Sequence, residues 1–233
     1  MPFFFQENLF QDSFTLSLEE SRHITKSMRL KENEIIWITD GKGTLVKTVL
    51  INVNRDCCIV EVKERIFQEK QTKKLHLAVA PTKNADRMEW LVEKAVEIGV
   101  DKISFIFCER SERKHIDLNR LHRVAVAALK QSQGTWLPEI QTNTFSRFIG
   151  ETTDINADKF VAYCGDRDHA TENTKLKFIH NDIIFMIGPE GDFTSHEVLE
   201  TQEKGFQIVS LGNKILRTET AALLVACWVA LNK

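Results

Sequence analysis

The chain has 233 residues, of which 42% are hydrophobic and 27% are charged, and its formal net charge is −2 at pH 7. This composition supports one large core or two modest ones, and it excludes a disordered or a fibrous protein. No run reaches the roughly 18 apolar residues of a membrane span, and residues 1–5 lack the basic flank and cleavage site of a signal peptide. We therefore expect a soluble protein in the cytoplasm that does not bind membranes.

The number and positions of the cysteines and histidines predict neither disulfide bonds nor a metal site. The odd number of cysteines, mostly among apolar neighbours, is typical of reduced thiols: Cys57, Cys58, Cys108, Cys164 and Cys227. The histidines form no HExxH motif, and the chain has no CxxC pair. A zinc site would need ligands from distant parts of the chain, so we predict no metal.

Residues 1–70 contain short β-rich pieces separated by turns. Strands are predicted over residues 34–39, 44–53 and 57–62, with a tight turn at residues 40–43 joining the first two. Strands linked by hairpins in this way indicate a small antiparallel barrel.

A helical piece and a linker flank these strands. Ser17 is the expected N-cap of the helix, and Glu20 stands at the capping-box position before the segment that continues to Met28. The charged, apolar-poor residues 63–74 form the expected linker. The sequence therefore predicts a first domain over residues 1–70 and a second over residues 71–233.

The second domain alternates strands with helices. Strands are predicted at residues 75–80, 103–107, 160–163, 183–187 and 207–211, and helices at 86–98, 118–131, 194–205 and 219–231. Gly99 and Gly205 end two of these helices, and Thr194 with Glu197 forms a capping box. This order predicts an α/β domain with a mostly parallel, helix-flanked sheet. The last helix is apolar on nearly every side, as expected of a helix buried against both a sheet and a partner.

Positive charge gathers in one stretch although the net charge is slightly negative. The stretch comprises Arg110, Arg113, Lys114 and His115, followed by Arg120, His122, Arg123 and Lys130. It fits contacts with nucleic-acid phosphates, but a solvated helix face of mixed charge explains it equally well.

Two familiar nucleotide sites are absent from the sequence. Gly41 and Gly43 lack the third glycine of GxGxxG, and no GxxxxGK[ST] motif occurs. Instead, the strand at 183–187 runs directly into Gly188, Pro189, Glu190, Gly191 and Asp192. The glycines let the main chain approach a ligand, and the proline stiffens the turn, although a purely structural turn remains an alternative.

A second loop follows the strand at 207–211. It leads through Ile215 and Leu216 to Arg217, immediately before the last helix. Thr218 as N-cap and an acidic first turn would stabilise that helix. The charge of Arg217 is repelled by the positive end of the helix dipole, so it either pairs with Glu219 or serves a role outside helix stability.

Together and in this order, the runs 188–191 and 215–221 resemble the cofactor pocket of SPOUT-class RNA methyltransferases. Most closely they resemble the 16S ribosomal RNA uridine-N3 methyltransferase family, ribosomal RNA small subunit methyltransferase E. The resemblance extends over nearly the whole chain, through His23, Met28, Arg29 and Leu30; Lys83, Arg87, Glu89, Lys94, Glu97 and Gly99; Arg110 and Ser111; and Gln131, Ser132 and Pro138.

The resemblance implies a PUA-like RNA-binding β-barrel over residues 1–70 and a SPOUT α/β domain with a deep trefoil knot over residues 71–233. A knot breaks a strong topological rule, and no periodicity in the sequence predicts it. The resemblance also implies a homodimer with its pocket at the subunit interface. The implied reaction is methyl transfer from S-adenosylmethionine to N3 of a uridine in 16S ribosomal RNA of the small subunit.

The resemblance assigns residues to each role. Arg217 is the candidate for stabilising the anionic uracil, and Glu219 is the candidate for orienting Arg217 or acting as a base. The cofactor is expected to contact Tyr163, Gly188, Pro189, Glu190, Gly191, Leu211, Gly212, Ile215, Leu216 and Arg217, with Cys164 nearby. The RNA phosphates are expected to contact Arg29, Arg110, Arg113 and Lys114.

The sequence departs from the family pattern at several positions. Asp192 and Asn33 stand where glycine is usual, and Lys130 and Gly134 stand where glutamate and arginine are common. Asn33 is expected to be benign because asparagine tolerates left-handed backbone. Asp192 is expected to reshape the cofactor loop, and Gly134 removes one expected contact with RNA.

Three other functions remain open on the sequence. A SPOUT enzyme could methylate a ribose 2′-hydroxyl of ribosomal or transfer RNA, which nucleoside analysis would distinguish. A non-catalytic RNA-binding or assembly protein would bind RNA without cofactor. An unrelated small-molecule α/β enzyme would need no basic surface.

Overall fold

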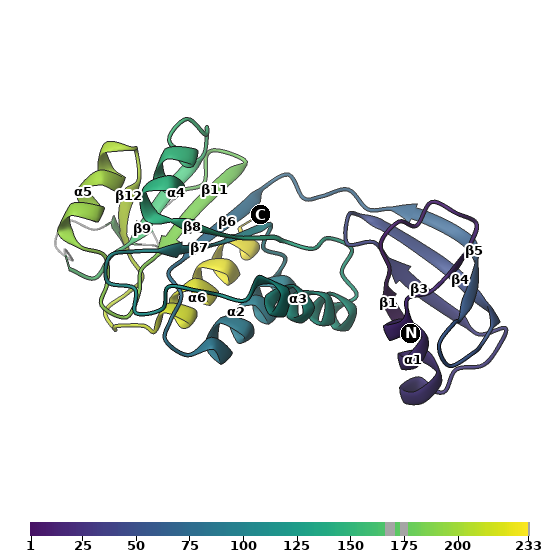
Figure 1. Ribbon diagram of the computed structural model, residues 1–233. Coiled ribbons are helices and arrows are strands. Elements are labelled where there is room, and N and C mark those ends of the chain that lie inside the picture. The colour runs from purple at the N-terminus through teal and green to yellow at the C-terminus, as the bar shows by residue number, and fades with distance from the viewer. Residues whose placement is uncertain (166–170, 173–176, 233) are drawn as a thin grey trace. The chain divides into compact units, whose positions relative to one another are not determined.

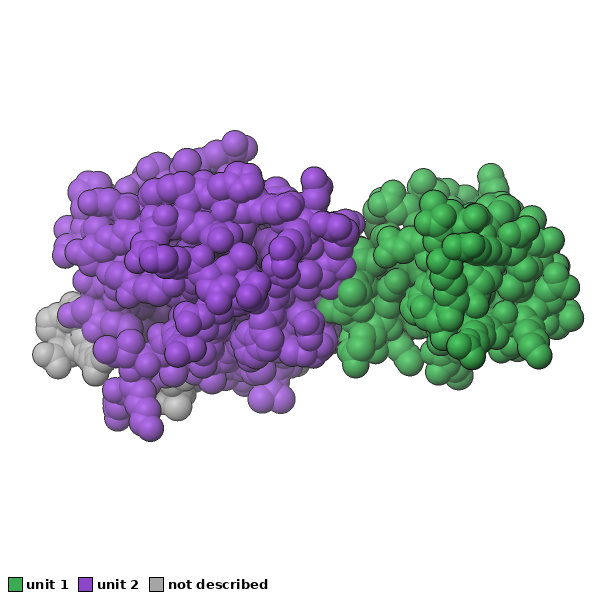
Figure 2. Space-filling view, turned by 60° about the horizontal axis from the view of Figure 1, so that its bottom comes forward, with its two compact units in different colours: residues 1–70, 126–137 green, residues 71–125, 138–233 purple. Residues whose placement is uncertain are grey.

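A computed structural model describes residues 1–165, 171–172 and 177–232 of the chain (Figure 1). The chain divides into two compact units, coloured separately in Figure 2. Unit 1 comprises residues 1–70 and 126–137, and unit 2 comprises residues 71–125 and 138–233. The sequence did not predict that residues 126–137 pack with the first unit.

Unit 1 is built on a five-stranded sheet in the order β1-β3-β4-β5-β2. The strands are β1 (Phe3–Phe5), β2 (Ser13–Thr15), β3 (Ile35–Thr39), β4 (Thr44–Asn52) and β5 (Ile59–Phe67). Alternate residues point inward, so Ile36, Ile38, Val46 and Val60 share one buried cluster with Phe4. The hairpins are antiparallel as predicted, whereas β1 pairs parallel with β3.

Two sequence predictions in unit 1 need correction. The linker expected over residues 63–74 is shorter, because β5 continues to Phe67 and Phe67 pairs with Thr44. The charged side chains of residues 63–65 are exposed while their main chain stays in the ladder, which explains the misleading composition. Strands β1 and β2 were not predicted, because three residues are too few to display an alternating pattern.

The helical piece consists of α1 (Leu18–Arg22) and a π-helical segment, η1 (His23–Met28). Ser17 is the N-cap, as predicted, and its hydroxyl accepts the N–H of Glu20 at 3.2 Å. The reciprocal half of the capping box was wrong, since the Ser17 N–H donates to Gln6 Oε1. Glu20 is buried and accepts from Lys130 Nζ at 2.8 Å. Lys130, a departure from the family pattern, therefore has a local electrostatic partner.

The other departures in unit 1 also have local explanations. Asn33 has φ 70°, in the left-handed region that asparagine tolerates, as expected. A Cβ on Gly134 would lie 2.9 Å from Leu129 Cδ1, so a side chain at this position would require the end of the Leu129 side chain to shift.

Unit 2 contains a seven-stranded sheet in the order β10-β12-β9-β11-β6-β7-β8, and the strand pairs that the structure describes are all parallel. The strands are β6 (Lys74–Val79), β7 (Lys102–Phe107), β8 (Glu139–Thr144), β9 (Asp158–Ala162), β10 (Thr171–Glu172), β11 (Asp182–Ile187) and β12 (Gln207–Ser210). The helices are α2 (Ala85–Ile98), α4 (Phe145–Thr152), α5 (Ser195–Glu203), α6 (Thr218–Leu231) and the first part of α3 (Leu118–Ser132), whose residues 126–132 belong to unit 1. The predicted α/β fold with a mostly parallel sheet is confirmed.

Helices cover both faces of this sheet (Figure 1). Ile184 and Met186 of β11 join a buried cluster with Phe148 of α4. Phe185, which points to the opposite face, meets the ring of Trp228 on α6 with the centroids 6.3 Å apart. The two buried faces explain why β11 is a continuous apolar run.

Two glycines allow a test of these helix assignments. Gly99 caps α2 with φ 88°, so Gly99→Ala is expected to lower the free energy of unfolding by about 1 kcal/mol. Gly150 lies inside α4, where an added Cβ meets nothing within 4 Å. Gly150→Ala is therefore expected to raise the free energy of unfolding by about 0.5–1 kcal/mol. Urea denaturation measures both, and equal shifts of the same sign would contradict the assignments.

Among the described residues, no helix is long and apolar enough to cross a membrane. Over the same part of the chain, His, Cys, Asp and Glu side chains do not gather in groups that could hold a metal ion. The trefoil knot stays a prediction.

Candidate active site

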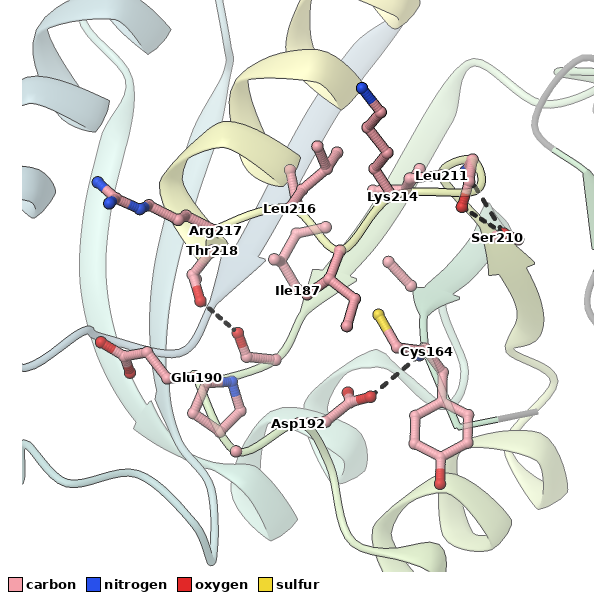
Figure 3. Close-up of a pocket in the computed structure, with 18 residues that line it drawn as sticks. Cys164, Ile187, Glu190, Asp192, Ser210, Leu211, Lys214, Leu216, Arg217 and Thr218 are labelled. Atoms are coloured by element: carbon pink, nitrogen blue, oxygen red, sulfur yellow. Dashed lines mark hydrogen bonds between the residues drawn. The ribbon is translucent and has the colours of Figure 1, made fainter. Parts of the chain in front are cut away.

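The main cavity of unit 2 lies at the carboxyl ends of β9, β11 and β12, the usual ligand-binding edge of a parallel sheet (Figure 3). Its volume is about 440 Å³, within the range of small-molecule sites. The lining comes from three loops and the start of α6: residues 162–164, 187–192, 210–212 and 214–218, with Ala221.

The two motif loops are joined directly by a buried hydrogen bond. The Thr218 hydroxyl donates to the Gly188 carbonyl oxygen at 3.0 Å, and Thr218 is only 5% exposed. The prediction that Thr218 is the N-cap of α6 was therefore wrong, because its hydroxyl is used between the loops. Arg217 occupies the N-cap position, with no side-chain capping bond.

The loop at 188–192 is also held by the loops that follow β6 and β7. Arg110 Nη1 donates to the Gly191 carbonyl at 2.9 Å, and the main-chain N–H of Lys83 donates to Glu190 Oε1 at 3.2 Å. Arg110, predicted to bind RNA, thus has its guanidinium against the cofactor loop. Arg110 remains exposed, and its contact with RNA stays a prediction.

Asp192 closes the same loop onto the end of β9. Its φ of 59° lies in the left-handed region, which aspartate tolerates better than most residues with a Cβ. Its carboxylate accepts the N–H of Cys164 at 3.0 Å and the N–H of Phe193 at 2.8 Å. Burial raises the pKa of this carboxyl, although both hydrogen bonds oppose the rise.

Arg217 lines the cavity with an exposed side chain. In Figure 3 its guanidinium extends away from the loop at Ser210 and Leu211. Within the described part of the chain, no acidic side chain forms an ion pair with it. The structure thus favours the second reading of Arg217, a role outside helix stability.

Glu219 is 6% exposed and does not line the cavity. Its Oε1 lies 3.6 Å from Arg87 Nε, and its buried Oε2 has no hydrogen-bond partner among the described residues. The structure therefore does not support the first alternative for Arg217, an ion pair with Glu219. The carboxylate instead faces α2.

All the residues predicted to contact the cofactor line this one cavity: Tyr163, Gly188, Pro189, Glu190, Gly191, Leu211, Gly212, Ile215, Leu216 and Arg217. The lining also includes residues that the sequence did not assign to the cofactor: Ala162, Ile187, Asp192, Ser210, Lys214, Thr218 and Ala221. Ala162, Ile187 and Ser210 are the last residues of β9, β11 and β12, so extending each predicted run back to the end of its strand would have found these three.

The residues predicted to contact RNA lie in both units. Arg29 is exposed in unit 1, where it ends η1 with φ 54°. Arg113 and Lys114 follow β7 in unit 2, and Lys114 Nζ donates to the Cys108 carbonyl at 3.3 Å. Lys114 nevertheless remains exposed.

Comparison with known proteins finds relatives that span the whole chain. A family model described as RNA methyltransferase domain matches residues 68–230, and one described as RNA methyltransferase PUA domain matches residues 17–63. The protein named "Ribosomal RNA small subunit methyltransferase E" from Mesomycoplasma hyopneumoniae is 28% identical, over 95% of this chain and 96% of that protein. Its namesake from Bacillus subtilis is 26% identical, over 91% of this chain and 87% of that protein.

Solved structures agree with these relatives. A probable rRNA-methyltransferase from Porphyromonas gingivalis is 35% identical with a TM-score of 0.89, covering 99% of this chain and 98% of that one. A ribosomal RNA small subunit methyltransferase E from Neisseria gonorrhoeae, solved with S-adenosylmethionine, is 25% identical with a TM-score of 0.87, covering 100% and 98%. With both units matched, the chain belongs to the RNA methyltransferase family whose curated members are named ribosomal RNA small subunit methyltransferase E.

Proposed function

We propose that this protein transfers a methyl group from S-adenosylmethionine to N3 of a uridine in 16S ribosomal RNA of the small subunit. The observation that carries the proposal is the cavity formed jointly by the loops at 188–192 and 210–217 and joined by the Thr218–Gly188 hydrogen bond. The names of the relatives, which refer to ribosomal RNA of the small subunit, support the choice of substrate.

The residues present suit S-adenosylmethionine. Ile187, Leu211 and Leu216 supply apolar walls, on which an adenine can pack. Gly188 and Gly191 expose main-chain groups at the rim, where peptide N–H and C=O can contact the adenine edge. When bound, the cofactor supplies an electrophilic methyl group.

Arg217 is the residue to which we assign stabilisation of the substrate. Methylation at N3 requires loss of the imide proton, and the uracil carries negative charge on its flanking carbonyl oxygens until the bond to the methyl group has formed. Arg217 has no acidic partner among the described residues, so its guanidinium can offer several N–H donors to those oxygens. The free N–H groups at the start of α6 add to the positive potential there.

Glu219 is a positioning residue in this proposal. Its carboxylate, buried beside Arg87, holds the first turn of α6 against α2 and so fixes the backbone on which Arg217 stands. Glu219 does not line the cavity, so we assign it no role as a base.

We assign the RNA phosphates to Arg29 in unit 1 and to Arg113 and Lys114 in unit 2. The target base is turned out of its stack to enter the cavity. Arg29→Ala is expected to weaken RNA binding by a similar factor for every sequence and to reduce the slope of log K against log salt by about 1. Filter binding over a salt series measures this, with S-adenosylmethionine affinity as the control that should stay unchanged.

We also propose that the enzyme works in the cytoplasm as a homodimer, as the resemblance implies. Exposed apolar side chains on α6, including Leu224, support a partner on that helix. Light scattering of the purified protein tests the dimer, and a monomer at all concentrations would contradict it.

The RNA substrate is tested by measuring which class of RNA receives the labelled methyl group. Purified protein is incubated with labelled S-adenosylmethionine and, separately, with small subunits, large subunits and transfer RNA from cells lacking this gene. The proposal expects label in 16S ribosomal RNA alone. Label in transfer RNA or large-subunit RNA would contradict it.

A further inference from the structure

Asp192 is one of two acidic residues, with Glu190, among the described residues that line the cavity. Its carboxylate reaches from the β11 loop to the Cys164 N–H at the end of β9, and both residues line the cavity (Figure 3). The charged ends of Lys214 and Arg217 extend outward in the same view. Glu190 also accepts a main-chain N–H, from Lys83, but Lys83 does not line the cavity, whereas the bond from Asp192 to Cys164 joins two cavity loops.

The carboxylate retains capacity for a ligand. Each of its oxygens accepts one main-chain N–H, from Cys164 and from Phe193. An ionised carboxylate has about four acceptor positions, so, counting the donors in the described part of the chain, about two remain for a bound molecule. The two main-chain bonds also fix the direction of the carboxylate, which reduces the entropy lost when a ligand binds.

The charge of the cofactor changes during the proposed reaction. The bond between the sulfonium sulfur and the methyl carbon breaks, a bond from that carbon to N3 forms, and the N3 proton leaves to solvent. S-adenosylmethionine loses the sulfonium charge and becomes neutral at sulfur in S-adenosylhomocysteine. A fixed negative charge in the wall stabilises the first molecule more than the second.

We propose that Asp192 is a specificity-determining residue that makes the cavity prefer S-adenosylmethionine over S-adenosylhomocysteine, and so favours release of the product. This inference rests on the proposed function, because it presumes that the cavity binds this cofactor. A residue that only tethered the loop would affect both molecules equally, since they share the adenosine and the amino-acid portion.

The test is isothermal titration calorimetry of the full-length protein with three ligands. These are S-adenosylmethionine, S-adenosylhomocysteine and sinefungin, which carries a protonated amine in place of the sulfonium. The variants are Asp192→Asn and Asp192→Gly, both compatible with φ 59°. Glu190→Gln is the matched control, since it removes the same charge from the same loop on a side chain that bonds the Lys83 N–H.

In Asp192→Asn we expect affinity for S-adenosylmethionine and sinefungin to fall about tenfold, the size for a partly solvated pair of charges, and affinity for S-adenosylhomocysteine to change by less than about threefold. Asp192→Gly should reduce the preference similarly, and Glu190→Gln should change it by less than about twofold. If Asp192→Asn weakened the binding of all three ligands equally, or if Glu190→Gln reduced the preference as much as Asp192→Asn does, this inference would be overturned. The proposed function would not be affected by either result. A wild-type protein that binds none of them would overturn the proposed function and this inference with it.

Discussion

Arg217→Ala is expected to lower kcat for methyl transfer by about 10²–10³-fold, while the dissociation constant of S-adenosylmethionine changes by less than about threefold. The guanidinium is exposed at the cavity and is not committed to an ion pair within the described residues, so it is available to the uracil. Single-turnover transfer to small subunits measures the rate, and calorimetry measures the affinity.

Two controls accompany the Arg217→Ala prediction, a second substitution and a measurement of thermal stability. Arg217→Lys keeps the charge but loses the planar fork of donors, so it should retain intermediate activity. The side chain makes no capping bond to α6, so both variants should melt close to the wild-type temperature. Full activity of Arg217→Ala would remove Arg217 from the mechanism.

Thr218→Val is expected to lower the free energy of unfolding by about 1–3 kcal/mol, because it leaves the buried Gly188 carbonyl without its donor. The two loops that the hydroxyl joins both line the cavity, so affinity for S-adenosylmethionine should fall about tenfold or more. Urea denaturation and calorimetry give the two quantities on the same preparation.

Thr218→Ser is the matched control, since it keeps the hydroxyl and removes only a methyl group. It should lose stability by a smaller amount and keep most of its affinity for the cofactor. If the valine and serine variants bound the cofactor equally well, the loops would not depend on this hydrogen bond.

Much of unit 2 could be predicted because its elements carry strong local signals. The apolar run of β11 and the capping box of Thr194 and Glu197 both appear where the sequence indicates. Gly99 marks the end of α2 because its φ of 88° suits glycine. These signals are local, so they can be read without knowledge of the fold.

Strand β8 was not predicted because polar side chains on it are hydrogen-bonded to polar side chains on the neighbouring strand. Gln141 donates to Ser104 Oγ at 2.9 Å, and the same hydroxyl lies 2.7 Å from Nε2 of His76. Burial lowers the pKa of His76 to about 3, so the imidazole is neutral at physiological pH. Where the side chains on a sheet face are polar and hydrogen-bonded to one another, the sequence shows no alternation of hydrophobic and polar residues.

The candidate site was predicted in outline but not in its contacts. Sequence alone located both loops, yet it assigned Thr218 to capping, left a pair between Glu219 and Arg217 open, and indicated no contact of Arg110 with the cofactor loop. The structure uses these side chains between loops, with Thr218 on Gly188, Glu219 beside Arg87 and Arg110 on Gly191. Such partners are distant in sequence, so only the fold could reveal them.

The most direct test of the account is the identity of the methylated nucleoside. Small subunits from cells lacking this gene are treated with the purified protein and S-adenosylmethionine, and the 16S ribosomal RNA is digested for mass spectrometry. The account predicts that the added methyl group is found in 3-methyluridine and that Arg217→Ala sharply reduces it. A methyl group found on a ribose 2′-oxygen, or no methylation by a protein that binds the cofactor, would contradict it.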